Sequence, residues 1–263
     1  MTAPFELRDG EASGAPLLFL HGFMGRPSMW DATLAELRGR SAIAPRPVAL
    51  GVLPGHGPAP WLPEGEGFFA AVDALARALP STRPAWLVGY SMGARVGLAL
   101  ALRHPARVAG AVLVGVDPGL RDEAARAERA AWDDAQALRI EAEGVAAFAA
   151  SWAALPLFAT QAALPGPLRA AQDAARREHT AAGLAWAMRA LGLGRMPPQW
   201  DTLRRAPPLH LVTGARDEKF AALAREIARV APGSTHRAIE GAGHNVALEA
   251  PGALAAEIAA RAG

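Results

Sequence analysis

Short apolar runs alternate along the chain with stretches in which apolar residues recur at helical spacing. The run Leu17 to Leu20 ends in His21-Gly22, which predicts a buried strand leading into a glycine loop. By the same pattern we expect further strands over residues 42–50, 86–88, 108–114, 209–213 and 235–239. Helical spacing predicts helices over residues 68–79, 94–103 and 218–230. Strand, helix and strand in this order favour parallel pairing and an α/β fold.

Residues 119–206 interrupt this alternation. The segment is rich in Ala, Arg and Trp, has helical spacing and contains no convincing strand. We therefore predict a helical cap over 119–206, inserted into a core formed by residues 1–118 and 207–263. The expected core is a mostly parallel sheet flanked by helices.

The composition excludes several classes of protein and of functional site. A length of 263 residues with 51% hydrophobic and 20% charged positions suits one large globular unit. The absence of cysteine excludes disulfides, thiolate metal sites and a cysteine nucleophile. Arginines are scattered and the net charge is only +2, so nucleic-acid binding is not expected. Residues 1–10 lack a signal-peptide pattern and no apolar run reaches about 18 residues, which predicts a soluble cytoplasmic protein without membrane insertion.

A possible nucleophile lies between an expected strand and helix. Gly89-Tyr-Ser91-Met-Gly93 has the nucleophile-elbow pattern, in which glycines permit a strained turn that exposes a serine hydroxyl. Asp217 follows a later strand and His244 follows the last one. The order Ser, Asp, His on these elements predicts a catalytic triad.

Such a triad also needs donors for an oxyanion. We expect the backbone N–H groups of Met92, after the serine, and of Phe23, in the glycine loop, to supply them. His21 and His56 are interpreted as structural loop residues, since neither has an acid or a second histidine at metal-ligand spacing. No metal and no organic cofactor are expected.

Over its full length the sequence resembles the α/β-hydrolase fold family, and more narrowly the SHCHC synthases of menaquinone biosynthesis (MenH). The serine elbow is shared by the whole superfamily, whereas the other matching motifs are less generic. The narrower resemblance rests on Leu20-His-Gly-Phe-Met-Gly25, Gly89-Tyr-Ser-Met-Gly-Ala-Arg95, Phe148-Ala-Ala-Ser-Trp152, Pro156-Leu-Phe158, Pro197-Pro-Gln-Trp200, Asp217-Glu-Lys-Phe220 and Ala242-Gly-His-Asn-Val246.

The resemblance implies a lyase that eliminates pyruvate from an enolpyruvyl cyclohexene carboxylate, with the triad serine as base. Such a substrate carries several carboxylates, which arginines bind with a planar fork of donors. Arg95, one helical turn beyond the serine, is expected to face the pocket. Arg129 and Arg176 are the cap arginines that best match the family, while surface positions remain the alternative for both. Tyr90 and Trp152 are expected to line the pocket, with core packing as the alternative; Lys219 and Phe220 receive no role.

Two other functions stay open. A carboxylesterase or related acyl hydrolase would use the same triad to form an acyl-serine on an uncharged ester. A non-catalytic ligand receptor on this fold would usually have lost a triad residue, and all three are present. The expected partner is a small-molecule carboxylate, and the sequence predicts no oligomeric state.

Overall fold

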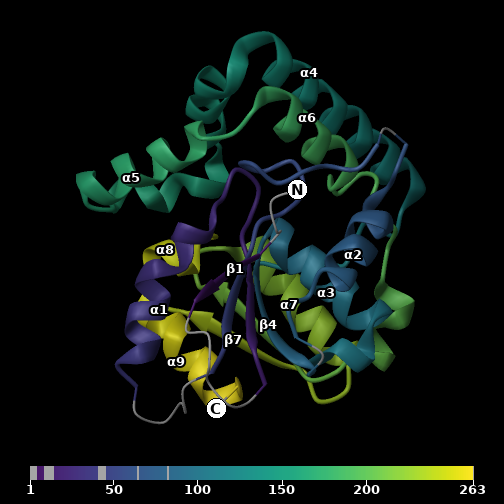
Figure 1. The fold of residues 1–263 in the computed structure, drawn as a ribbon, viewed down its shortest axis with the longest axis vertical. Helices are drawn as coiled ribbons and strands as arrows, with labels where there is room; N and C mark the ends of the chain where they lie inside the picture. Colours follow the sequence, from purple (N-terminus) through teal and green to yellow (C-terminus); the bar gives the residue numbers. More distant parts are fainter. Residues whose placement is uncertain (1–4, 9–14, 41–45, 64, 82, 263) are drawn as a thin grey trace.

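The computed structural model describes residues 5–8, 15–40, 46–63, 65–81 and 83–262. Its centre is a sheet with helices around it (Figure 1). The sheet has seven strands in the order β1-β3-β2-β4-β5-β6-β7. Strand β1 pairs antiparallel with β3, and all other neighbours are parallel. The strands are β1 Phe5–Arg8, β2 Leu17–Leu20, β3 Val48–Gly51, β4 Ala85–Tyr90, β5 Val108–Val114, β6 Leu209–Gly214 and β7 Thr235–Ile239.

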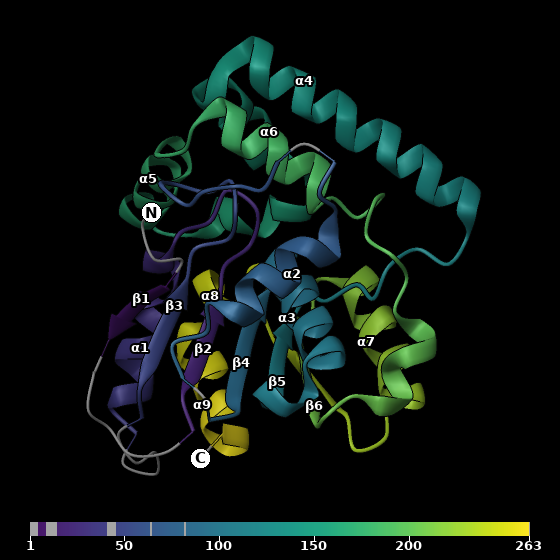
Figure 2. The ribbon, with the colours of Figure 1, turned by 45° about the vertical axis from the view of Figure 1, so that its right-hand side comes forward.

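Helices cover both faces of the sheet (Figure 2). The helices that pack on the sheet are α1 Asp31–Arg38, α2 Phe68–Arg77, α3 Met92–Arg103, α7 Glu218–Val230, α8 Val246–Glu249 and α9 Pro251–Ala262. Successive strand residues point to opposite faces. In β5, Leu113 packs in one core cluster with α2, α3 and α7, whereas Val114 packs in the other with α1, α8 and α9. Apolar side chains on both faces explain the continuous apolar runs of the central strands.

The sequence predicted these elements well where strands are buried and less well at the sheet edge. The expected strands at 17–20, 108–114 and 235–239 and the helix at 218–230 are confirmed with their bounds. The strand expected over 42–50 runs over Val48–Gly51, and residues 41–45 of that range lie outside the described part. The edge strand β1 and the helices α1, α8 and α9 were not predicted.

A helical layer, called the cap below, lies over one end of the sheet. It contains α4 Glu123–Ala153, α5 Gly166–Arg177 and α6 Ala181–Ala190, with the 3₁₀ segment Pro156–Ala163 between α4 and α5 (Figure 2). Helix α4 is kinked at Gly144, where φ is 80°. A third apolar cluster joins α4 and α6 to Met24 of the core. The bounds 119 and 206 of the cap as a domain stay a prediction.

Within the described ranges, no single helix is long and apolar enough to cross a membrane, although α4 and the following 3₁₀ segment pass by length and composition as a bent pair.

Candidate active site

Ser91 lies in a sharp turn between β4 and α3. Its backbone is strained, with φ 51° and ψ −110°, and its N–H donates to the Val114 carbonyl over 2.9 Å. A Cβ on Gly93 would collide with the Leu20 carbonyl oxygen, so this position requires glycine. The side chain of Ser91 thereby emerges at the end of β4, as the elbow pattern predicts.

The structure brings Ser91, His244 and Asp217 into one hydrogen-bonded line. Nδ1 of His244 donates to Oδ2 of Asp217 over 2.7 Å, and Nε2 lies 3.1 Å from Oγ of Ser91. Because an ionised carboxylate only accepts, the proton of a neutral His244 belongs on Nδ1, which leaves Nε2 to accept the serine proton. His244 and Asp217 are both buried. This arrangement can serve a general base or a nucleophile.

Two backbone hydrogen bonds join the loops that carry Asp217 and His244. The N–H of Ala215 donates to the Ile239 carbonyl over 2.8 Å, and that of Arg216 donates to the Ala242 carbonyl over 3.0 Å. These bonds fix the acid relative to the histidine.

Aromatic rings enclose the imidazole of His244. The ring centroids of Phe220, Tyr90 and Phe158 lie 4.5, 5.3 and 6.2 Å from that of His244. Phe220, for which the sequence predicted no role, thus packs directly on this histidine. Burial raises the pKa of the Tyr90 hydroxyl, which stays protonated at neutral pH.

The two residues expected to donate to an oxyanion lie on adjoining segments. Met92 is the first residue of α3, where N–H groups have no partner within the helix. Phe23 belongs to the loop after β2. The start of that loop lies against the elbow, since a Cβ on Gly93 would collide with the carbonyl oxygens of Leu20 and His21. The backbone around Phe23 is held by a bond of 2.9 Å from Gly25 N–H to the Gly22 carbonyl.

Three buried histidines accept hydrogen bonds from the backbone of the loops that follow β2 and β3. His21 Nε2 accepts from the Leu53 N–H over 3.1 Å, His56 Nε2 accepts from the Met24 N–H over 3.1 Å, and His179 Nδ1 accepts from the Gly57 N–H over 2.9 Å. Burial lowers the pKa of His21 to about 3 and that of His179 to about 4, and it holds the pKa of His56 well below 6.5. Neutral imidazoles that accept from the backbone agree with the structural role predicted for His21 and His56. His179 was missed, since its partner is 122 residues away.

A cavity of about 380 Å³ opens between the cap and the core beside this line of residues. Tyr90, Trp152 and Arg176, all expected in the pocket, line it together with Phe23. The centroid of Trp152 lies 5.0 Å from that of Phe23, so this cap residue joins the cavity wall to the loop after β2. Much of the remaining wall is apolar: Met24, Met29, Ala32, Phe158, Leu168, Ala171, Ala175, Ala247, Leu248 and Pro251.

Arg176 brings a positive charge to this wall. The residue is 6% exposed, its guanidinium lies 5.5 Å from the centroid of Phe158, and its Nη1 contacts Asp173 at 3.3 Å. Burial lowers the pKa of Arg176. A half-exposed carboxylate is a weak counter-ion for a buried guanidinium, so the site can accept a further anion.

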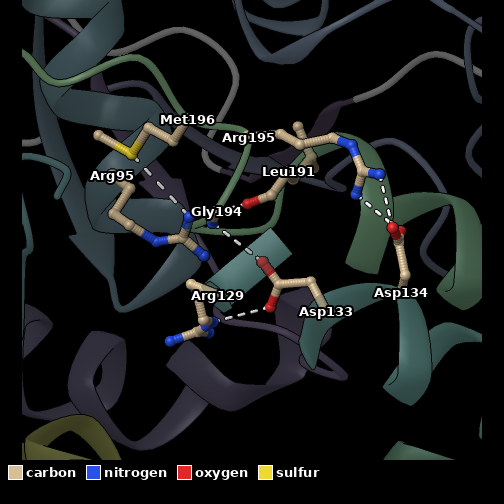
Figure 3. A network of polar contacts seen from close by, with 8 residues as sticks. All are labelled: Arg95, Arg129, Asp133, Asp134, Leu191, Gly194, Arg195 and Met196. Carbon is tan, nitrogen blue, oxygen red and sulfur yellow. Dashed lines mark hydrogen bonds and ion pairs between the residues drawn. The ribbon is translucent and has the colours of Figure 1, made fainter. Parts of the chain in front are cut away.

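Arg95 and Arg129 do not belong to the wall of this cavity. Figure 3 shows Arg95 of α3 near Arg129 and Asp133, which both belong to α4. Arg129 Nε donates to Oδ1 of Asp133 over 2.8 Å, and Oδ2 of the same buried carboxylate accepts from Gly194 N–H over 3.0 Å. Asp133 therefore fixes Arg129 to the segment that follows α6.

Arg95 is buried, and the carboxylates of Asp117 and Asp133 act on its guanidinium only through charge, without an ion pair in the described part of the chain. Its Nη1 donates to the Leu191 carbonyl over 2.8 Å and lies 3.9 Å from Sδ of Met196 (Figure 3). Its backbone N–H donates to the Ser91 carbonyl over 3.0 Å, one helical turn beyond the serine, but its side chain is not among those that line the cavity, where it was expected. Burial lowers the pKa of Arg95 to about 10, which still leaves it protonated at neutral pH.

Among the described residues, no group of three or more His, Asp or Glu side chains could hold a metal ion. The cavity wall also contains residues that were not assigned to the site from the sequence, among them Phe158 and Met29. Phe158 was part of a matching motif but lacked a chemical signal, and Met29 lies in the short 3₁₀ helix Pro27–Trp30, which only the tertiary fold brings to the cavity.

The fold and the arrangement of Ser91, His244 and Asp217 are those of an α/β hydrolase. The model of the alpha/beta hydrolase family matches residues 17–257, and the chain belongs to this family. Within it, the chain belongs with the 2-succinyl-6-hydroxy-2,4-cyclohexadiene-1-carboxylate synthases. The synthase of Salmonella agona is 35% identical over 250 residues, 94% of this chain and 93% of that protein. The synthase of an Enterobacter species is 34% identical over 255 residues, 96% and 93% of the two chains.

Solved structures show the same likeness. MenH from S. aureus superposes with a TM-score of 0.90 at 27% identity and covers 98% of this chain and 97% of its own. A thermophilic esterase from Thermogutta terrifontis, solved with malate bound, superposes with a TM-score of 0.79 at 26% identity, over 97% and 91% of the two chains. The chain is therefore similar both to a synthase and to a hydrolase.

Proposed function

We propose that this protein is a carbon–oxygen lyase that eliminates pyruvate from a cyclohexene carboxylate carrying an enolpyruvyl ether and a succinyl group. A base removes the ring proton at C2, next to the succinyl carbonyl. The C2–H electrons form C2=C3, the C3=C4 double bond moves to C4=C5, and the C5–O bond breaks. The enolate of pyruvate leaves and takes up a proton, and 2-succinyl-6-hydroxy-2,4-cyclohexadiene-1-carboxylate remains.

Ser91 acts as the base in this proposal. His244 takes the serine proton at Nε2 while Ser91 Oγ abstracts the substrate proton, and Asp217 orients the imidazole and stabilises its charged form. Negative charge develops on the succinyl carbonyl oxygen. The N–H groups of Met92 and Phe23 stabilise this oxyanion, and the proton held by His244 returns to the departing enolate.

The observation that carries the proposal is the buried guanidinium of Arg176 in the cavity wall, whose ion pair at 3.3 Å is with the half-exposed carboxylate of Asp173. A buried charge with so weak a counter-ion is costly, and an anionic ligand would offset that cost. The proposal also assigns substrate carboxylates to Arg95, one turn from Ser91, and to Arg129, although neither lines the cavity. Tyr90 and Trp152 contribute apolar surface against the ring.

One observation favours a second function. The wall of the cavity is mainly apolar, which suits the acyl group of an uncharged ester. In that case Ser91 Oγ would attack the ester carbonyl, the alcohol would leave, and water would hydrolyse the acyl-serine. The likeness to the Thermogutta esterase supports this alternative.

A side-by-side assay separates the two functions. The purified protein is given the enolpyruvyl cyclohexene intermediate and, separately, a short p-nitrophenyl ester, and pyruvate and p-nitrophenol are measured. We expect kcat/KM to be larger for the lyase substrate by at least about 100-fold, since two carboxylate contacts of about 1.5 kcal/mol each suffice for that ratio. Efficient ester hydrolysis without pyruvate release would overturn the lyase and leave the esterase.

A further inference from the structure

Glu249, the last residue of the one-turn helix α8, contacts the backbone on both sides of His244. Its Oε2 accepts from the Gly243 N–H over 2.7 Å, and its Oε1 accepts from the Asn245 N–H over 3.2 Å. One carboxylate thus uses both oxygens on the two residues adjoining the histidine. Nothing in the sequence motifs pointed to this residue.

Local structure keeps Glu249 in this position. The side chain of Asn245 caps α8 by accepting from the Leu248 N–H over 3.2 Å, and the Glu249 N–H donates back to the Asn245 carbonyl over 2.9 Å. The segment and the carboxylate therefore hold each other through four hydrogen bonds.

Packing leaves the histidine loop little room to move away from this carboxylate. A Cβ on Gly243 would collide with Oγ1 of Thr160 from the cap, and one on Gly214 would collide with the Gly243 carbonyl oxygen. A Cβ on Gly115 would lie 2.7 Å from Cε1 of His244. The loop is enclosed by the cap, β5 and β6, and Glu249 holds it from the side of α8.

We propose that Glu249 is a positioning residue for His244. Hydrogen bonds to a charged acceptor are about twice as strong as neutral ones, and a carboxylate fork fixes direction as well as distance. Held on both sides, the imidazole keeps its Nε2 at 3.1 Å from Oγ of Ser91. The inference rests on the proposed roles of Ser91, His244 and Asp217.

A positioning role predicts a particular kinetic pattern. Glu249 does not line the cavity, so its loss should leave substrate binding nearly unchanged. A displaced imidazole, by contrast, slows proton transfer, and a misplacement of about 1 Å can cost about 100-fold. The effect should therefore appear in kcat and not in KM.

The test compares Glu249→Ala and Glu249→Gln with Glu257→Gln as the matched control. Glu257 is a partly exposed glutamate of the neighbouring helix α9 that contacts His210 at 2.8 Å and does not line the cavity. Three quantities are measured for each folded protein: kcat and KM on the preferred substrate, and the rate of Ser91 phosphonylation by a fluorophosphonate, followed by mass spectrometry.

We expect Glu249→Ala to lower kcat and the phosphonylation rate by about 10- to 100-fold, with KM changed less than about threefold. Glu249→Gln keeps one acceptor oxygen and should lose less, whereas Glu257→Gln should stay within about twofold of the wild type. Circular dichroism and thermal unfolding check the fold, and Glu249→Gln carries the test if the alanine variant does not fold.

Two results would overturn the inference, and they differ. If wild-type Ser91 reacts and both Glu249 variants react at the wild-type rate with unchanged kcat, Glu249 does not position His244 and the proposed function stands. If wild-type Ser91 does not react with the fluorophosphonate at all, its activation by His244 fails, and the inference fails with it.

Discussion

Nε2 of His56 accepts a hydrogen bond of 3.1 Å from the backbone N–H of Met24. Met24 has a φ of 56°, a left-handed conformation that non-glycine residues rarely adopt. It directly follows Phe23, one of the two residues proposed to donate to the oxyanion. A histidine 32 residues away in the sequence thus holds the strained turn next to that donor.

Replacing His56 should therefore reduce catalysis through the backbone. In His56→Ala the Met24 N–H loses its buried acceptor, which costs about 1–3 kcal/mol in stability. We also expect kcat to fall by about tenfold or more, since loss of one oxyanion donor costs about 10²–10³. His56→Gln offers an amide oxygen near the position of Nε2 and should recover most of both losses.

The control for this experiment is His210→Gln, because His210 is buried in β6 and bonds Thr235 and Glu257, none of which lines the cavity. Steady-state kinetics and urea unfolding of the three variants supply the comparison. A fully active His56→Ala protein would show that the turn keeps its shape without this bond.

Ser91 and His244 should behave as one proton-transfer unit. Ser91→Ala and His244→Ala are each expected to lower kcat by about 10²–10⁴, as loss of positioned acid–base catalysis does. The double variant should be scarcely slower than either single one, because the two residues act on the same proton. Stability should change little for Ser91→Ala, whose side chain is partly exposed. An active Ser91→Ala protein would remove the triad from the mechanism.

Acid should destabilise the fold through the buried histidines. Their folded pKa values lie below the unfolded value of 6.5, at about 4 for His179 and about 3 for His21. Between pH 6.5 and about 4 the unfolded chain then binds more protons than the folded protein. The contribution of these histidines to the free energy of unfolding is therefore fully present above pH 6.5 and is lost as the pH drops. Each histidine contributes at most about 1.4 kcal/mol per pH unit in this window.

His179→Asn tests this linkage, because the Asn Oδ1 can accept from the Gly57 N–H in place of Nδ1 but cannot be protonated in this range. Urea unfolding at pH 7 and pH 4.5 should show a smaller loss of stability for the variant than for the wild type. An identical loss in both proteins would exclude His179 from the acid response.

The sequence was sufficient for the central strands because burial on both faces makes their apolar runs continuous, as in Val108–Val114. It was insufficient for β1, Phe5–Arg8, where one residue is buried and three are exposed. Helix α9, Pro251–Ala262, was not predicted, although Leu254 and Ile258 have helical spacing and are buried.

The candidate site, too, was predicted in part from the sequence. The order and the elements of Ser91, Asp217 and His244 could be predicted, since the elbow has a local signature. The contact of Glu249 with Gly243 and Asn245 and that of His179 with Gly57 could not, since they depend on loop geometry and on the cap. The sequence does not distinguish the two cap arginines, because the difference between them depends on the tertiary structure. Arg176 reaches the cavity wall, whereas Arg129 pairs with Asp133.

Substitution of Arg95 distinguishes the proposed lyase from the esterase. A hydrogen bond to a charged group is worth on the order of 1.5–3 kcal/mol, so Arg95→Ala should lower kcat/KM for the carboxylate-bearing lyase substrate by about 10- to 100-fold. The loss on a neutral p-nitrophenyl ester should be small. Arg95→Lys should restore only part of the activity, because an ammonium keeps the charge but not the planar fork.

The matched control is Arg195→Ala, in the same segment that carries the acceptors of Arg95 (Figure 3). Arg195 is exposed and bonds both oxygens of Asp134 at 2.7 Å, so its loss should leave both activities within about twofold. Equal losses on both substrates for Arg95→Ala, or a loss confined to the ester, would remove the carboxylate-binding role. The apolar cavity beside Ser91 would then be the stronger guide to the substrate, and it favours an uncharged ester.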